Sequence, residues 1–152
     1  MSPSLPPATP TPYDLPEAPA WEPLLEAAWS TRRLAHAPYS HFQVGAALLL
    51  EDGRIIAGCN VENAAYPVGL CAERGAVSAA VAQGLRPGGL VAAVVVTEAD
   101  RLTPPCGACR QVLAEFALDL PILLANGRQR ELHRLAALLP HSFSGLHFQP
   151  GS

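Results

Sequence analysis

The 152-residue sequence contains no lysine, and its ten basic side chains are all arginines. Without lysine, the chain lacks both the Schiff-base nucleophile of many lyases and the lysine of a P-loop phosphate site. The arginines are scattered, and the net charge is −3. Because nucleic-acid binders gain much of their affinity by neutralising phosphates, we expect no nucleic acid among the partners of this chain.

The sequence also lacks any apolar run that approaches the roughly 20 residues of a membrane-spanning helix. Its first twenty residues contain neither a basic leader nor an apolar segment typical of secretory signals. We therefore expect no membrane partner and a cytoplasmic location. Residues 1–20 are rich in proline and show no periodicity, which predicts a flexible tail before a single domain at residues 21–148.

Hydrophobic residues make up 49% of the chain and charged residues only 15%, which is typical of a globular protein with one core. Four cysteines are present, at positions 59, 71, 106 and 109. In a reducing compartment, such cysteines indicate a metal or catalytic site more often than disulfide bonds.

The hydrophobic pattern predicts helices that alternate with strands. Asp52-Gly53 joins two apolar runs, as in a β-hairpin. Continuous apolar runs, expected of strands covered on both faces, occupy residues 90–97 and 121–125. Helical patterns occupy residues 21–37, 71–83, 106–117 and 131–140. This order predicts an α/β fold of three α/β/α layers, whose mixed sheet combines an N-terminal hairpin with parallel strands.

The motif Cys106-Gly107-Ala108-Cys109 places two thiols at the start of a predicted helix. Residues i and i+3 share a helix face, and the positive end of the helix dipole lowers the pKa of a thiol. This favours thiolates that bind a soft divalent metal. A redox role is the alternative, although redox motifs usually follow the first strand of a thioredoxin-like unit, whereas this one follows two prolines late in the chain.

Cys71 lies at the start of another predicted helix, and helices that follow parallel strands begin at one edge of the sheet. Cys71, Cys106 and Cys109 can therefore converge on one zinc ion. Three protein ligands leave a tetrahedral zinc with one open position, as in catalytic sites. Glu73 would lie beside that position as a proton carrier, and Arg74 could donate hydrogen bonds to thiolate sulfurs. The alternative for Arg74 is a solvated helix residue.

These motifs together resemble those of the cytidine deaminase family, the zinc-dependent cytidine/deoxycytidylate deaminases of the short, homotetrameric type. The resemblance rests on Y-S-H-F-Q-V-G from Tyr39, N-V-E-N from Asn60, C-A-E-R from Cys71, P-C-G-A-C from Pro105 and L-L-P-H-S-F from Leu138. It extends from about Trp21 to Phe143. A His/Cys-x-Glu motif followed by Pro-Cys-x-x-Cys is the known signature of zinc deaminases.

The resemblance implies a cytidine deaminase-like fold, one zinc ion per subunit and a small-molecule nucleoside substrate. The implied reaction is hydrolytic deamination of cytidine, and of 2′-deoxycytidine, to the uridine product and ammonia, with Glu73 as the catalytic proton carrier. A related enzyme acting on another aminopyrimidine nucleoside analogue is an alternative. A structural zinc module without catalysis is a second.

The resemblance also assigns substrate contacts. Asn60 and Glu62 would bind the ribose hydroxyls, Phe42 would pack against the pyrimidine, and the backbone N–H of Ala72 would bind the ring carbonyl. Without the resemblance, packing in the core explains Phe42 equally well. The alternative for Asn60 is a turn residue, and the alternative for Glu62 is an exposed loop acid. Members of this type are usually homotetramers, and two further residues match positions that reach a neighbouring subunit, namely Tyr66 and Phe143.

Two positions need separate interpretation. Cys59 lies in the second hairpin strand and is expected to be a small buried hydrophobe. The alternative is a fourth zinc ligand, which would close the site and make it structural. Gly75 occupies a position where the family often has threonine, and a helical glycine costs up to about 1 kcal/mol.

Overall fold

The computed structural model describes residues 21–148, so the tail predicted at residues 1–20 lies outside the described residues. Five strands are present in this part of the chain: β1 (Gly45–Leu50), β2 (Ile55–Cys59), β3 (Leu90–Val96), β4 (Pro121–Ala125) and β5 (Arg130–Arg134). The α-helices are α1 (Trp21–Arg32), α2 (Ala72–Ala82), α3 (Gly107–Ala114) and α4 (Leu135–Leu138). Two short 3₁₀ helices are η2 (Tyr66–Val68) and η3 (Gly145–Phe148).

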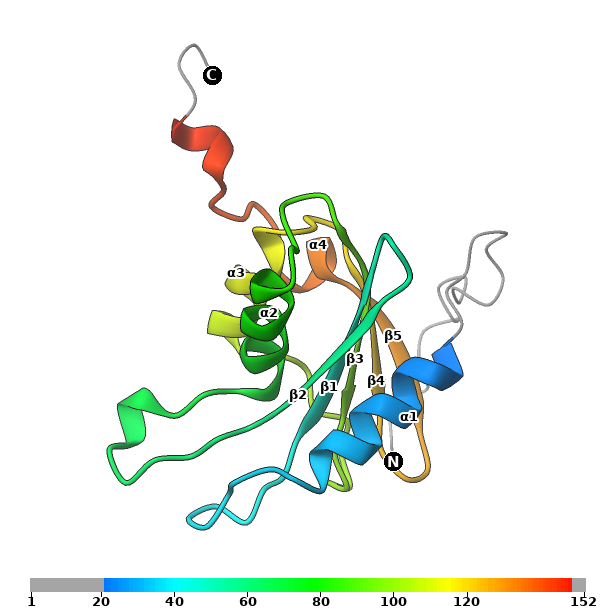
Figure 1. Cartoon of the computed structure of the whole chain (residues 1–152), viewed down its shortest axis with the longest axis vertical. Coiled ribbons are helices and arrows are strands. Elements are labelled where there is room, and N and C mark those ends of the chain that lie inside the picture. Colours follow the sequence, from blue (N-terminus) through cyan, green and yellow to red (C-terminus); the bar gives the residue numbers. More distant parts are fainter. Residues whose placement is uncertain (1–20, 149–152) are drawn as a thin grey trace, which may run out of the picture.

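The strands form one mixed sheet in the order β2-β1-β3-β4-β5 (Figure 1). β1 is antiparallel to both of its neighbours, β2 and β3, whereas β3 and β4 are parallel. β2, β3 and β4 therefore run in the same direction. Their carboxyl ends lie at one edge of the sheet, and α2 follows β2 while α3 follows β3. This geometry brings the starts of the two helices to the same edge, as the sequence predicted.

Helices cover both faces of the sheet, which confirms the α/β fold with a mixed sheet. α1 packs on one face, and α2, α3 and α4 lie on the other (Figure 1). The alternation of side chains in β3 shows both interfaces: Ala93 and Val95 are buried against α2 and α3, whereas Val94 and Val96 are buried beneath α1. No helix within residues 21–148 combines the length and apolarity required to cross a membrane.

Two glycines allow helices to lie unusually close to the sheet. A Cβ atom on Gly58 of β2 would lie 2.6 Å from the backbone oxygen of Ala72 and 2.5 Å from the backbone nitrogen of Ala76 in α2. On the other face, a Cβ atom on Gly45 would lie 2.1 Å from the backbone oxygen of Ala28 in α1. Since no side chain fits at Gly58, this glycine fixes the distance of α2 from the sheet.

The helix predicted at residues 131–140 is wrong in its first half. Arg130–Arg134 form β5, an antiparallel edge strand paired with β4, and only Leu135–Leu138 are helical. The side-chain oxygen of Asn126 accepts hydrogen bonds from the N–H groups of Arg128 and Gln129, which shapes the turn between β4 and β5. Pairing with the exposed edge of β4 outweighs the weak helical pattern of this short segment.

The first helix is also shorter than predicted: α1 ends at Arg32, whereas the prediction extended it to the residue before Pro38. Beyond it, the N–H of His36 donates to the backbone oxygen of Asn60, and the N–H of Glu62 donates to the oxygen of His36. These strand-like bonds require an extended backbone at His36, so the helix stops earlier. They also draw the segment after α1 against the segment after β2.

Replacing Gly75 with alanine is expected to stabilise the protein. A Cβ atom at this position in α2 would meet only ordinary contacts, at 3.5 Å from the Cys59 oxygen and 3.6 Å from Leu70 Cδ2. Because alanine loses less conformational entropy than glycine in a helix, the free energy of unfolding should rise by about 0.5–1 kcal/mol. Urea denaturation at fixed protein concentration and metal content measures this change.

Gly58→Ala is the matched control, because it adds the same methyl group where the backbone of α2 leaves no room. This substitution should lower the free energy of unfolding by about 1–3 kcal/mol. Equal effects of the two substitutions, in sign and size, would contradict the packing described here.

Candidate active site

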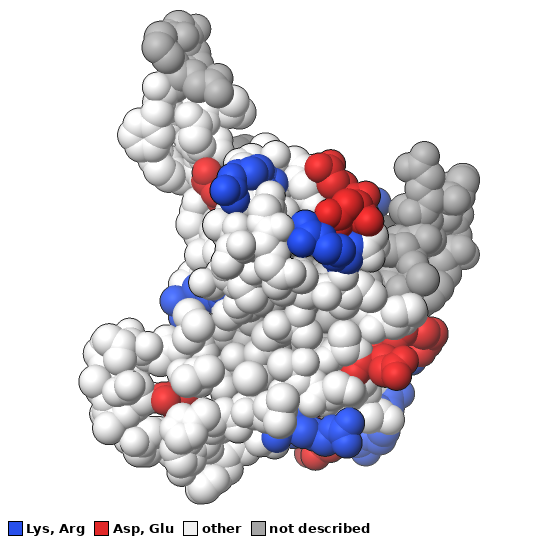
Figure 2. Space-filling view, viewed as in Figure 1, with Lys and Arg blue, Asp and Glu red and all other residues white. Residues whose placement is uncertain are grey.

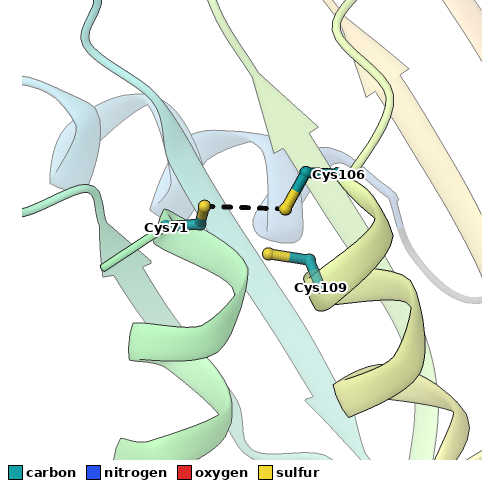
Figure 3. Close-up of side chains that lie close together, drawn as sticks. All are labelled: Cys71, Cys106 and Cys109. Carbon is teal, nitrogen blue, oxygen red and sulfur yellow. Dashed lines mark hydrogen bonds between the residues drawn. The ribbon is translucent and has the colours of Figure 1, made fainter. Parts of the chain in front are cut away.

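Three cysteine sulfurs converge where α2 and α3 begin. Cys71 is the N-cap residue of α2, Cys106 is the N-cap residue of α3, and Cys109 lies in the first turn of α3. Their Sγ atoms lie within 4.8 Å of one another, and those of Cys71 and Cys106 are 3.8 Å apart. Figure 3 shows all three side chains pointing toward a common centre from the two helix ends.

This spacing fits a zinc ion. With Zn–S bonds of about 2.3 Å, the edges of a tetrahedron of sulfurs measure about 3.8 Å, which matches the distance between Cys71 and Cys106. Three sulfurs occupy three corners and leave one for water or substrate. Among the described residues, this is the group of cysteine, histidine and acidic side chains whose ligand atoms lie close enough to hold a metal.

Cys59 is not part of this cluster. Alternation along β2 places its side chain on the α1 face with Ile55 and Ala57, whereas Gly58 faces α2. The Cys59 thiol is half-buried, and burial raises its pKa. Its position on the opposite face of the sheet argues against a closed four-thiolate site.

The two helix N-termini and the mutual contacts of the thiols shape the electrostatics of the site. Burial opposes ionisation of Cys106, but hydrogen bonds from the backbone and side chain of Cys109 outweigh it and lower the pKa of Cys106. Burial, together with the nearby Glu73 carboxylate, raises the pKa of Cys109. Metal binding by thiols releases protons, so a cation at their centre is needed to hold both as thiolates.

Glu73 lies in the first turn of α2 and is only 5% exposed. Its Oε2 atom lies 3.6 Å from the Sγ atom of Cys109, which places the carboxyl group beside the metal cluster. Burial raises the pKa of Glu73 above the ordinary value. A carboxyl group beside a metal site, with its pKa raised above the ordinary value, is chemically suited to accept a proton and to deliver it again.

Arg74 directs its guanidinium group toward the cluster. Its Nη2 atom donates a hydrogen bond to the Sγ atom of Cys71 at 3.5 Å. Its Nε atom is buried without a hydrogen-bond partner among the described residues. This geometry favours the predicted charge-balancing role over that of a solvated helix residue, because a thiolate partner offsets the cost of desolvating the cation.

A cleft of about 370 Å³ opens beside the cluster, a size typical of small-molecule sites. All the residues predicted to contact substrate line it: Phe42, Asn60, Glu62 and Ala72. Glu73, Cys71 and Cys106 form its inner end. Ala72 is the first residue of α2, so its backbone N–H has no partner within the helix and can serve a ligand.

Asn60 and Glu62 also support the cleft wall. The amide of Asn60 donates to the backbone oxygen of Phe42 at 2.7 Å and accepts from the N–H of Val44 at 2.8 Å. Glu62 accepts hydrogen bonds from the N–H groups of Tyr39 and Ser40 and from the Ser40 hydroxyl. These backbone contacts were not predicted, since nothing in a linear sequence indicates which loop a side chain will bind.

The cleft includes residues that sequence reasoning missed, among them Thr103 and Pro104. The hydroxyl of Thr103 lies 3.2 Å from that of Thr97, which is buried directly after β3. Both missed residues directly precede the Pro-Cys-Gly-Ala-Cys motif. Their position next to a metal-ligand motif is the signal that could have identified them.

Tyr66 and Phe143, the residues matched to cross-subunit positions, lie in different places. Tyr66 is 73% exposed at the mouth of the cleft and packs edge-to-face with Tyr39, with ring centroids 5.6 Å apart. Phe143 is 58% exposed on the C-terminal segment that projects from the body (Figure 1). Phe143 does not line the cleft of its own chain.

An apolar surface surrounds the cleft mouth. The segments at residues 33–43 and 60–70 form a lobe that carries very little charge in Figure 2. Several large apolar side chains are exposed there: Leu34, Tyr39, Phe42, Val61, Tyr66, Val68 and Leu70. Exposed apolar patches of this kind occur both at protein–protein interfaces and around ligand-binding grooves.

Zinc content should distinguish an open site from a closed one. Cys59→Ala is expected to keep one zinc per chain, because Cys59 lies on the opposite face of the sheet. Cys106→Ala should lose most of its zinc, because it removes one of three ligands. Atomic absorption on the purified variants measures both contents, and loss of zinc from Cys59→Ala would indicate a fourth ligand.

Comparison with known proteins agrees with this site. A family model described as the cytidine and deoxycytidylate deaminase zinc-binding region matches residues 20–124. The chain is 46% identical over 124 residues to a cytidine deaminase of Halalkalibacterium halodurans, covering 80% of this chain and 92% of the relative. It is 47% identical over 125 residues to a cytidine deaminase of Sporosarcina psychrophila, covering 81% of this chain and 90% of the relative.

Solved structures show the same similarity. The cytidine deaminase of Burkholderia pseudomallei superposes with a TM-score of 0.77 at 46% identity, covering 80% of this chain and 97% of that one. The cytidine deaminase of Mycobacterium tuberculosis superposes with a TM-score of 0.69 at 40% identity, covering 82% and 98%. With the cluster of Cys71, Cys106 and Cys109 as its zinc-binding site, the chain belongs to the cytidine and deoxycytidylate deaminase family.

Proposed function

We propose that the chain catalyses the hydrolytic deamination of cytidine, and of 2′-deoxycytidine, to uridine or 2′-deoxyuridine and ammonia. One observation carries the proposal: a buried carboxyl group, Glu73, lies beside a three-thiol metal site inside a nucleoside-sized cleft. The similar proteins that are named cytidine deaminases support the same substrate class.

Each group of residues in the cleft has its own role in the proposed reaction. Zinc held by Cys71, Cys106 and Cys109 would supply a Lewis acid that makes water a better nucleophile toward C4 of the base. Glu73 moves protons, first to ring N3 and then to the departing amino group. The backbone N–H of Ala72 donates to the ring carbonyl oxygen, and Phe42 packs against the face of the ring. At the other end of the cleft, Asn60 and Glu62 hold the sugar hydroxyls.

The sugar end of the cleft does not by itself decide between cytidine and a different aminopyrimidine substrate. Glu62 accepts three hydrogen bonds from the loop that contains Tyr39 and Ser40, so its carboxylate has partners even when a free base without a sugar occupies the cleft. A panel of cytosine, cytidine, 2′-deoxycytidine and cytidine analogues separates these substrates. The second alternative, a structural zinc module, is disfavoured by the position of Cys59 on the far face of the sheet.

The proposal includes a homotetramer in the cytoplasm, where reduced thiols persist. The apolar lobe around the cleft mouth, together with the projecting Phe143, supports association between copies of the chain. In such an assembly, Phe143 of one subunit completes the cleft of its neighbour. Tyr66, at the rim of the cleft, would contact the neighbouring subunit.

Replacement of Glu73 tests the proton-carrier assignment. Glu73→Ala should retain zinc, because Glu73 is not one of the clustered thiol ligands. Its kcat for cytidine should fall by about 10²–10⁴-fold, since a positioned acid–base group contributes roughly that factor. Loss of cytidine absorbance and release of ammonia measure the rate. Turnover at the unsubstituted rate with zinc still bound would contradict the assignment.

Complementation between two variants tests the shared site. Phe143→Ala alone and Glu73→Ala alone should each have low activity. Co-expressed chains with different tags should recover about a quarter of the unsubstituted activity, because half of the chains keep Glu73 and half of their neighbours supply Phe143. Purification through both tags, light scattering and a cytidine assay measure the outcome. Hybrid oligomers that remain inactive would show that Phe143 does not act across subunits.

A further inference from the structure

The loop between α1 and β1 supplies Phe42 to the cleft but belongs to no regular element. Directly before Phe42, the backbone of His41 adopts a left-handed conformation, with φ of 59°. Left-handed backbone is strained for most residues other than glycine and persists only where neighbouring contacts hold it. The position of the Phe42 ring therefore depends on the contacts that fix this loop.

The Ser40 side chain provides such a contact. Its hydroxyl oxygen accepts a hydrogen bond from the N–H of Phe42 at 3.0 Å, and the same hydroxyl donates a hydrogen bond to Oε2 of Glu62. The N–H of Ser40 donates to Oε1 of Glu62 at 3.1 Å. Ser40 thus joins the backbone of the residue proposed to pack on the base to the carboxylate proposed to bind the sugar.

The other side of the Phe42 backbone is held by Asn60, whose amide donates to the Phe42 oxygen at 2.7 Å. Both polar backbone groups of Phe42 are consequently fixed by side chains, the N–H by Ser40 and the oxygen by Asn60. Removal of the Ser40 hydroxyl releases one of these two attachments. The thiol cluster and Glu73 lie at the starts of α2 and α3, whereas the hydrogen bonds of Ser40 reach Glu62 and Phe42.

Glu62 is oriented by the same contacts. A carboxylate offers about four acceptor directions, and the loop occupies three of them through Tyr39 and Ser40. About one direction is left for a sugar hydroxyl, on the oxygen that the Ser40 hydroxyl holds. Hydrogen bonds from Ser40 also lower the pKa of Glu62, which keeps this group an ionised acceptor.

We propose that Ser40 is a positioning residue for the deamination, which holds the Phe42 ring and the Glu62 carboxylate in a fixed relative position. The inference rests on the proposed nucleoside substrate. Because Ser40 acts on binding groups and not on Glu73 or the thiols, its loss should weaken substrate binding more than it slows the chemical step.

Ser40→Ala is the direct test, with steady-state kinetics on cytidine. The KM should rise about tenfold while kcat changes less than about twofold, since a hydrogen bond to a charged group is worth roughly a factor of ten. Ser40→Thr keeps the hydroxyl at an exposed position, and its KM should return to within about twofold of the original. Ser78→Ala, an exposed serine of α2 outside the cleft, is the matched control and should change neither constant.

A second measurement separates positioning from general damage to the fold. In a Glu73→Gln background, which is expected to bind cytidine without turnover, calorimetry should show about tenfold weaker cytidine binding when Ser40→Ala is added. In a Glu62→Ala background, the further effect of Ser40→Ala on kcat/KM should shrink well below tenfold, because the two residues act as a unit. Zinc content and the unfolding midpoint should stay unchanged.

Several results would overturn the inference: an unchanged KM for Ser40→Ala, an equal loss for Ser40→Thr, a full additive effect in the Glu62→Ala background, or a parallel loss of zinc. Failure of the proposed function is recognised separately. In that case the unsubstituted, zinc-loaded chain does not deaminate cytidine, and the inference about Ser40 falls with it. If the unsubstituted chain is active and only the Ser40 results disagree, the inference alone is wrong.

Discussion

The close approach of α2 to β2 is the constraint on which the site depends. Cys71 caps the start of α2, whereas Cys106 and Cys109 lie at the start of α3, so their sulfurs meet only if both helices begin at the same edge and depth of the sheet. Parallel directions of β2 and β3 set the edge. The absent side chain at Gly58 sets the depth, because any Cβ atom there would push α2 outward. A displacement of about 1 Å is large compared with the tolerance of metal–ligand distances.

The electrostatics of the site follow from the same arrangement. Two helix N-termini and the Arg74 guanidinium supply positive potential around sulfurs that must become thiolates. Burial raises the pKa of both Glu73 and Cys109, whereas hydrogen bonds lower the pKa of Cys106. A bound cation is therefore needed for the thiols to ionise together, and the raised pKa of Glu73 suits the carboxyl group to its proposed exchange of protons. Glu73 and Arg74 lie two and three residues after Cys71, within one helical turn. The start of α2 therefore supplies a metal ligand, a carboxyl group and a positive charge.

The sequence predicted the parts of the molecule that local chemistry determines. Asp52-Gly53 indicated the hairpin, continuous apolar runs indicated β3 and β4, and the cysteine spacing with strand order indicated the three-thiol cluster. The prediction was wrong where tertiary pairing decides the conformation. β5 forms because the edge of β4 is available, and α1 ends early because His36 pairs with the segment after β2. The contacts of Asn60 and Glu62 with the Phe42 loop depend on residues about 18–23 positions away, which no local pattern encodes.

The cleft therefore combines two kinds of construction. Its reactive end is built on helix termini packed against a sheet, where geometry is fixed by the core. Its binding end is built on two loops, at residues 33–43 and 60–70, which are held together by backbone hydrogen bonds at His36 and by side chains that reach between them. Loops held by a few hydrogen bonds adapt more readily than core elements, which suits recognition of a substrate that must enter and leave.

The same loops expose apolar side chains at the cleft mouth. A neighbouring subunit that covers them would restrict the loops and exclude water from the cleft, which strengthens every polar contact inside it. In the proposed assembly, association and substrate binding are thus two consequences of one exposed lobe.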